Sequence, residues 1–325
     1  MRNFYVLLSC VVFASGCENY FGDTTRLPNA EVAVRQNLVI GAAFTNTDTI
    51  LALRTDASYN VFTGYPFRQA SAASWPTVDN PDQLIDITVE NGESLATFNF
   101  IPQDQRRGEN FQNNEQYPAY TANNNYVSPA DGSIFEPGRT YALSVDTRRE
   151  APTVVQQTMP SRIANVELAV DPGIVTDPFG EVGRSVTVSF DDRPEEDNFY
   201  ILQALVRRRG GTLELVTVTD TDPRTEDFGF GTREIMLTDR DDPATRLSVT
   251  FTASLGANPG ENELFGVRLL NVTEDWYRYL TDFQRYRSVI ADINDGFVDP
   301  FPLHSNVPGG FGYFVLGYEE IFPVE

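Results

Sequence analysis

The feature that most constrains the fold is a series of short apolar runs that alternate with period two and are separated by turn residues. Residues 84–89 alternate strictly, and residues 95–100 follow them after Asn91-Gly92, a dipeptide that favours a tight hairpin turn. Similar runs continue without intervening helical patterns as far as residues 264–270. This spacing predicts an all-β fold of antiparallel sandwiches or barrels. Most runs are shorter than the roughly 9–11 residues of a transmembrane strand, which favours a water-soluble β protein.

The strand pattern is interrupted once, at residues 159–162, where Pro160 would break a hydrogen-bonded ladder. A new set of runs begins at residue 166. We therefore predict two domains, an N-terminal, immunoglobulin-like β-sandwich over residues 35–159 and a C-terminal β domain over residues 160–325. With about 300 residues after a leader, both domains are large enough to bury a core.

One amphipathic helix is expected near the C-terminus, over residues 274–290. Thr273 is suited to cap it, and Glu274 and Asp275 place negative charge at its positive end. Aromatic and apolar side chains fall on one stripe at helical spacing: Trp276, Tyr279, Leu280, Phe283, Tyr286 and Ile290. We interpret this stripe as a packing face, the alternative being a ligand site.

The N-terminus is typical of a secretory leader, with Arg2 before an apolar run and small residues before Cys17. The apolar run is too short to span a bilayer. The sequence Ala14-Ser15-Gly16-Cys17 resembles the bacterial lipobox, although Ala14 replaces the usual Leu, Val or Ile. We expect residues 1–16 to be removed between Gly16 and Cys17, Cys17 to be acylated, and residues 17–34 to form a tether. The alternative is an ordinary leader that leaves a free thiol at Cys17.

Composition excludes several classes of site. The chain has a net charge of −22, so phosphate backbones would be repelled and no nucleic-acid partner is expected. Only one histidine is present, His304, so any Ser-His-Asp arrangement would have to use it. The acidic stretch over residues 220–242 does not follow the EF-hand pattern, which favours solvated loops over a non-standard calcium site. We predict no catalytic residues, no metal site and no cofactor, although 46 acidic residues leave a glycosidase pair open.

Two irregular segments carry aromatic side chains suited to contacting a ligand or partner. Tyr117, Tyr120 and Tyr126 lie among asparagines and glutamines, and Trp75 lies in a second such segment. Tyrosine and tryptophan offer rigid contact area with a polar tip, as recognition surfaces require. These four residues are our candidate contacts, the alternative being that they pack onto the first domain.

Five segments resemble a known family: residues 138–141 (Gly-Arg-Thr-Tyr), 158–160 (Thr-Met-Pro), 191–200 (DDRPEEDNFY), 272–280 (VTEDWYRYL) and 301–314 (FPLHSNVPGGFGYF). With the lipobox-like motif, they are similar to Bacteroidota outer-membrane lipoproteins that carry the domain of unknown function 4249. The resemblance implies a two-part β architecture and a lipid anchor in the outer membrane. It implies no catalytic residue, and we expect the glycines at 309, 310 and 312 to set a tight turn.

Genes of this family typically neighbour a TonB-dependent receptor. The resemblance therefore implies a non-enzymatic accessory, exposed at the cell surface, that helps such a receptor to capture or take up a substrate. Two alternatives remain open, an adhesive or structural surface module and a surface hydrolase.

Overall fold

The computed structural model describes residues 37–48, 50–58, 84–89, 91–101, 126–129, 134–146, 151–176, 180, 182–193, 196–209, 211–220, 222, 224–225, 232–240, 245–256, 262–292 and 303–324. Apart from the outer ends of the first two strands, these residues belong to one compact unit made of residues 39–55 and 80–325. The description below concerns that unit.

The described residues form seventeen strands and one helix. The first eight strands are β1 (Asn37–Thr45), β2 (Ile50–Ser58), β3 (Leu84–Val89), β4 (Ser94–Thr97), β5 (Asn99–Phe100), β6 (Tyr126–Pro129), β7 (Thr140–Asp146) and β8 (Thr153–Thr158). The remainder are β9 (Ala164–Thr176), β10 (Val182–Asp191), β11 (Phe199–Arg207), β12 (Leu213–Val216), β13 (Val218–Asp220), β14 (Ile235–Thr238), β15 (Arg246–Ser254), β16 (Glu263–Val272), α4 (Glu274–Asp292) and β17 (Phe311–Pro323). The expected all-β class with one helix near the C-terminus is confirmed.

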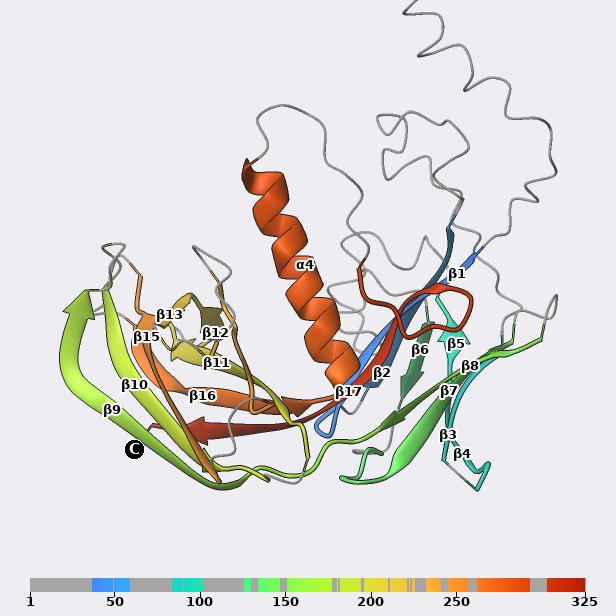
Figure 1. Cartoon of the computed structure of the whole chain (residues 1–325), viewed down its shortest axis with the longest axis horizontal. Coiled ribbons are helices and arrows are strands. Elements are labelled where there is room, and N and C mark those ends of the chain that lie inside the picture. Colours follow the sequence, from blue (N-terminus) through green and yellow to red (C-terminus); the bar gives the residue numbers. More distant parts are fainter. Residues whose placement is uncertain are drawn as a thin grey trace, which may run out of the picture. The chain divides into compact units, whose positions relative to one another are not determined.

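A nine-stranded sheet is the largest sheet of this unit (Figure 1). Its order is β12-β11-β16-β17-β1-β2-β6-β5, and β14 also pairs with β11. Two four-stranded sheets complete the structure, β4-β3-β7-β8 and β13-β15-β10-β9. The expected hairpin at Asn91-Gly92 joins β3 to β4, which pair antiparallel, and Gly92 has a φ of 80°.

Strand β17 joins the two halves of the nine-stranded sheet. Its first part pairs in parallel with β1, from Val39↔Phe311 to Thr45↔Gly317. Its second part pairs antiparallel with β16, from Val272↔Gly317 to Gly266↔Pro323. The sequence predicted neither this strand nor a parallel pair, because β17 is buried over several consecutive residues and so shows no alternation.

The predicted domain boundary after residue 159 falls between β8 and β9, whereas the nine-stranded sheet takes strands from both sides of it. The division into two domains stays a prediction. The described strands on either side are continuous through β17 within one compact unit.

Each four-stranded sheet is associated with its own core. In the N-terminal half, the ring of Phe44 contacts those of Phe98 and Phe135, and also that of Phe314 from β17. In the C-terminal half, one buried cluster combines side chains of β10 and β15 with those of β11 and β16. Because β17 contributes to the first core with Phe314 and borders the second with Phe322, burial as well as hydrogen bonding ties it to both halves.

Tyr141 fixes the entry into β7. Its side chain is fully buried, its hydroxyl donates to the carbonyl of Ile134 at 3.0 Å, and the backbone N–H of Glu136 donates to that hydroxyl at 2.7 Å. Immunoglobulin-type sandwiches use a tyrosine in the same way, to hold the chain that precedes a strand. Burial raises the pKa of Tyr141, so the hydroxyl stays neutral.

Helix α4 packs on the nine-stranded sheet through the predicted stripe. Tyr277 belongs to a buried cluster with Val272 and residues of β11, and Trp276 and Leu280 pack against it. A Cβ at Gly317 of β17 would approach the Trp276 ring at 2.9 Å, so this glycine lets the ring lie close to the strand. The interpretation of the stripe as a packing face is therefore confirmed for Trp276 and Leu280, whereas Tyr277, which is the most buried of the three, was not part of the predicted stripe.

Candidate functional site

The first turn of α4 is fixed to β17 by hydrogen bonds. The carbonyl oxygen of Thr273, at the N-cap position, accepts from the N–H groups of Trp276 and Tyr277 at 3.0 and 3.1 Å. The N–H of Thr273 donates to the carbonyl of Leu316 at 2.9 Å, and its hydroxyl accepts from the N–H of Leu316 at 3.4 Å. The hydroxyl of Thr273, which the sequence predicts to cap α4, therefore accepts a hydrogen bond from strand β17.

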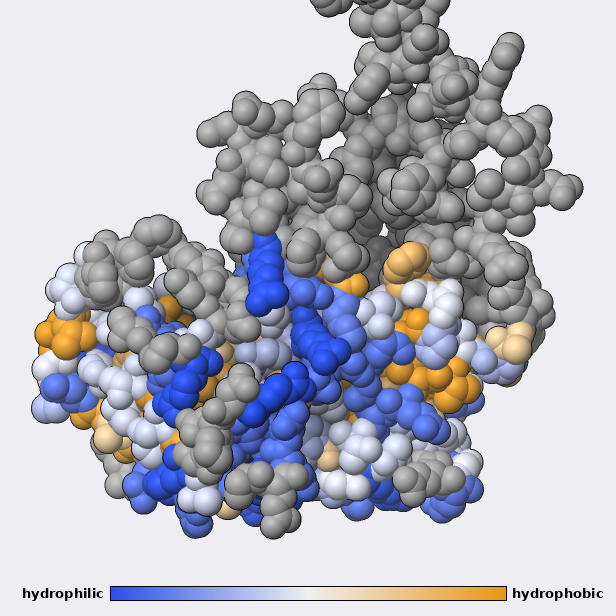
Figure 2. Space-filling view, viewed as in Figure 1, coloured by the Kyte–Doolittle hydropathy of each residue, from blue (hydrophilic) through white to orange (hydrophobic). Residues whose placement is uncertain are grey.

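A polar pocket of about 490 Å³ opens beside this helix start. It is lined by residues 156–158 of β8, residues 196–199 at the start of β11 and residues 271–275 where β16 passes into α4, together with Thr140, Pro160 and Ser161. The volume lies within the roughly 300–1,000 Å³ of small-molecule sites. Hydrophilic residues also gather over the start of α4 on the face seen in Figure 2.

Asp275 organises one wall of the pocket. Its carboxylate accepts hydrogen bonds from Gln157 Nε2 at 2.5 Å and Asn306 Nδ2 at 2.9 Å, and it lies 2.6 Å from His304 Nε2. Burial favours the neutral carboxyl, but the bonds to His304, Asn306 and Gln157 outweigh it and hold the pKa of Asp275 below its usual value. The carboxylate is therefore ionised and joins β8, α4 and the segment before β17.

Asn306 extends this network into the sheet. Its side-chain amide donates to the carbonyl of Phe314 at 2.7 Å and accepts from the N–H of Phe314 at 3.0 Å, as a neighbouring strand would. Gly309 and Gly312, which follow it, have φ angles of 67° and 97°. The expectation that these two glycines supply a turn with positive φ is confirmed.

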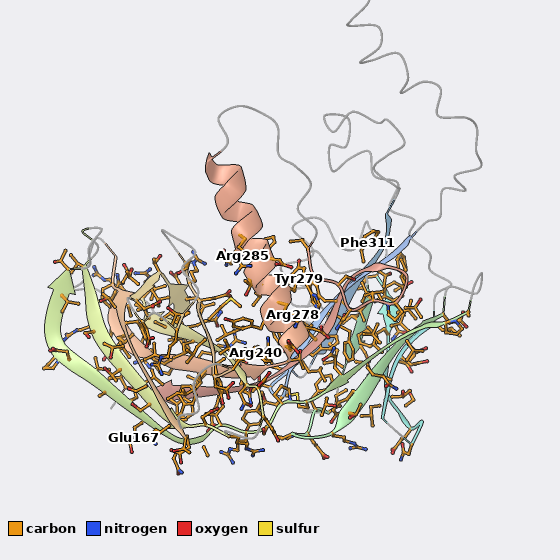
Figure 3. The ribbon with its side chains drawn as sticks, in the orientation of Figure 1. Glu167, Arg240, Arg278, Tyr279, Arg285 and Phe311 are labelled. Carbon is orange, nitrogen blue, oxygen red and sulfur yellow. The ribbon has the colours of Figure 1, made fainter. Side chains whose placement is uncertain are left out.

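Arginines neutralise the outer rim. Arg240 donates to Asp197 at 2.9 Å and to Glu274 at 2.7 Å, and Arg278 pairs with Glu274 at 2.5 Å. Figure 3 shows Arg240 beside the first turn of α4 and Arg278 further along the helix. The hydrogen bonds with Glu274 and Asp197 raise the pKa of Arg240, so the guanidinium stays charged.

The chemistry of this pocket is hydrogen bonding. Four carboxylates line it, at Glu196, Asp197, Glu274 and Asp275, together with amides and hydroxyls from β8. Because Arg240 and Arg278 pair with Asp197 and Glu274, such a lining suits a neutral, hydroxyl-bearing ligand.

The histidine is held in the pocket wall. Its ring hydrogen-bonds Asp275, its backbone N–H donates to Asp282 at 2.9 Å, and within the described residues no serine or threonine hydroxyl bonds the ring. Among those residues, no group of three or more His, Cys, Asp or Glu side chains is placed to hold a metal ion. In the same part of the chain, no helix combines the length and apolar character needed to cross a bilayer.

Of the predicted contact residues, only Tyr126 lies within the described structure. It begins β6, is 1% exposed and packs edge-on against Phe100, so it is part of the core and is wrongly predicted as a contact. Phe100 pairs with it across the ladder, and this local partner explains the burial. Trp75, Tyr117 and Tyr120, like Gly16 and Cys17, lie outside the described residues.

The acidic stretch over residues 220–242 is partly described. Asp222 accepts from the Arg224 guanidinium at 2.7 Å, and these hydrogen bonds lower the pKa of Asp222. The hydroxyl of Thr225 donates to Asp220 at 2.5 Å. Asp220 and Asp222 are thus engaged in turn and loop contacts, whereas Asp239 is buried and bonds Asn198, and Glu234 accepts from Gln203 of β11.

The sequence did not predict that these residues line one pocket, although it singled out the segments that contain many of them. The five segments that resemble a family meet here, with Thr140, Thr158, Pro160, residues 196–199 and residues 272–275 in the lining. His304 and Asn306 of the fifth segment bond Asp275. Because these residues are far apart in the sequence, local patterns do not reveal that they are close in space. The resemblance of their segments to one family was the one signal that singled them out.

Comparison with known proteins gives one family. A family model described as "Domain of unknown function (DUF4249)" matches residues 22–320. No curated protein matches this chain. Among solved structures, the crystal structure of a Salmonella alpha-2-macroglobulin mutant matches 73% of this chain at 13% identity, with a TM-score of 0.20. This chain spans 13% of the length of that protein.

Proposed function

Because the chain belongs to the DUF4249 family, we propose that it is a lipid-anchored, non-enzymatic binding protein of the outer membrane that assists a TonB-dependent receptor. In this role the protein is exposed at the cell surface, and it captures a substrate or hands it to the receptor. Acyl chains at Cys17 provide the anchor, because each buried methylene contributes about 0.8 kcal/mol and two or three chains hold a protein firmly.

One observation supports a binding role above the others. Segments separated by more than a hundred residues, and resembling the same family, surround a single polar pocket. The pocket wall is built from hydrogen-bonded polar side chains on regular strands and a helix start, so its shape is preorganised.

Anchoring is tested by replacing Cys17 with serine. We expect the wild-type mature chain to fractionate with outer membranes and to carry acyl chains at its N-terminus by mass spectrometry. The Cys17→Ser variant should lose the acyl mass and leave the membrane fraction. An unmodified, released wild-type product would refute the anchor.

The receptor role is tested by co-purification from detergent-solubilised outer membranes. We expect a TonB-dependent barrel to accompany the wild-type protein. Glu196→Arg reverses a charge on the exposed pocket rim and should weaken this association or substrate capture. Glu93→Arg makes the same change in the exposed β3–β4 turn and is the matched control. If no barrel is recovered and a surface polymer is, an adhesive module is favoured.

A further inference from the structure

Two aspartates are buried behind the pocket, at the ends of strands from two different sheets. Asp192 directly follows β10 and is 7% exposed, and Asp239 directly follows β14 and is 6% exposed. Neither forms an ion pair with an arginine of the described residues. Burying two carboxylates without a cation is costly unless one of them is neutral.

Asn198, which lines the pocket, connects the two aspartates. Its backbone N–H donates to Asp239 Oδ1 at 2.7 Å, and its side-chain amide lies 3.0 Å from Asp239 Oδ2 and 3.3 Å from Asp192 Oδ1. The same amide nitrogen also lies 3.2 and 3.0 Å from the carbonyls of Arg193 and Glu196. One NH₂ group with two protons therefore faces four acceptors.

The remaining hydrogen bonds leave one oxygen unsatisfied. The hydroxyl of Tyr200, from β11, donates to Asp192 Oδ1 at 2.7 Å. Asp192 Oδ2 is buried and has no hydrogen-bond partner. A buried acceptor oxygen without a donor indicates that another group donates a proton to it. The carboxyl of Asp239 is the neighbouring group able to do so.

The titratable and charged groups around the two aspartates are consistent with a proton between them. Burial, opposed by the bonds from Asn198 and reinforced by a hydrogen bond with Asp192, raises the pKa of Asp239 to about 6. Tyr200 stays neutral because burial and the Asp192 carboxylate raise its pKa. Arg193 contributes positive charge to this environment, but it pairs with neither aspartate.

We propose that Asp192 and Asp239 share one proton, donated across the pair to Asp192 Oδ2, and that this proton holds Asn198 in the pocket wall. The proton then resides on Asp239, and the pair carries one negative charge. Loss of the proton leaves two buried negative charges, which weakens the attachment of Asn198 and the described residues around it. This proposal does not depend on what the pocket binds.

The direction of the pH dependence follows from the folded-state pKa. Because it lies above the ordinary value of 3.8, the unfolded chain loses this proton at lower pH than the folded chain does. The stabilising contribution is complete below the ordinary value and is lost as the pH rises through about 6. The contribution of this proton to the midpoint of unfolding should therefore fall between pH 4 and pH 7 and level off above.

The test uses the mature chain in detergent and the isosteric variant Asp192→Asn. In this variant the amide nitrogen takes the place of the unsatisfied oxygen and donates to an ionised Asp239, so the hydrogen bond runs in the opposite direction and no longer needs the shared proton. We expect its denaturant midpoint to lose the fall between pH 4 and pH 7 and to equal or exceed that of wild type at pH 8. Asp191→Asn, at the exposed neighbouring position, is the control and should keep the fall, because Asn165 and Arg246 lower the pKa of Asp191.

A second readout detects the proton itself. Infrared spectra of protein with ¹³C-labelled aspartate should show a protonated carboxyl stretch at pH 5 that disappears by pH 8 and is missing from Asp192→Asn. A wild-type midpoint that does not fall over this range, or a fall retained by Asp192→Asn, would overturn the proposal. So would stabilisation by added calcium at pH 8 that Asp192→Asn abolishes, since a bound cation would then occupy the pair.

Discussion

Gly312 is the position where a single added methyl group should do most damage to the nine-stranded sheet. Its φ of 97° is one that residues with a side chain rarely adopt, and it pairs with Ile40 in the parallel ladder between β17 and β1. A Cβ at Gly312 would overlap the backbone carbonyl of Ile40. Gly312→Ala therefore combines backbone strain with a steric clash against β1, which is held in place by its neighbours in the sheet.

Gly309 provides the matched control, three residues earlier in the same segment. Its φ is 67°, and a Cβ there would meet nothing within 4 Å. Gly309→Ala should cost only the strain, about 1–2 kcal/mol. Gly312→Ala adds a steric term of about 1–3 kcal/mol for overpacking, giving about 2–5 kcal/mol in total.

Urea unfolding of the two variants measures the difference. A gap of about 2 kcal/mol corresponds to about 0.7 M urea when the slope is about 3 kcal/mol/M. Because β17 joins both halves, we expect Gly312→Ala to lower the stability of both. If the two variants lose the same stability, the close approach of β1 to β17 is not what requires glycine at position 312.

Three further substitutions test other contacts by the same unfolding assay. Tyr141→Phe removes the hydroxyl that serves two backbone groups and should cost about 1–3 kcal/mol; no loss would show that solvent replaces it. Trp276→Ala empties the space beside Gly317 and should cost about 3 kcal/mol, whereas an unchanged midpoint would mean that α4 contributes little. Asp275→Asn should destabilise the protein at pH 7, and because the pKa of Asp275 is lowered, the difference from wild type should shrink as the pH falls through that value. A pH-independent difference would indicate that the bond to His304 and the carboxylate charge are unimportant.

The sequence by itself determined what local patterns encode. Period-two alternation located most strands, Asn91-Gly92 located the hairpin of β3 and β4, and the cap and stripe located α4. These features depend on neighbouring residues, because side-chain direction repeats every two residues in a strand and every 3.6 in a helix. The same local logic identified the glycines with positive φ before and within β17.

Tertiary structure alone decided which distant segments meet. Strand β17 is buried on both faces and pairs with β1 more than 260 residues away, so no alternation or turn signal announces it. Tyr126 looked like a loop contact until its burial against Phe100 was evident. The pocket and the Asp192–Asp239 pair likewise depend on strand ends that come from different sheets. Burial raises a pKa and can leave an oxygen without a hydrogen-bond donor, and it is a property of the assembled core.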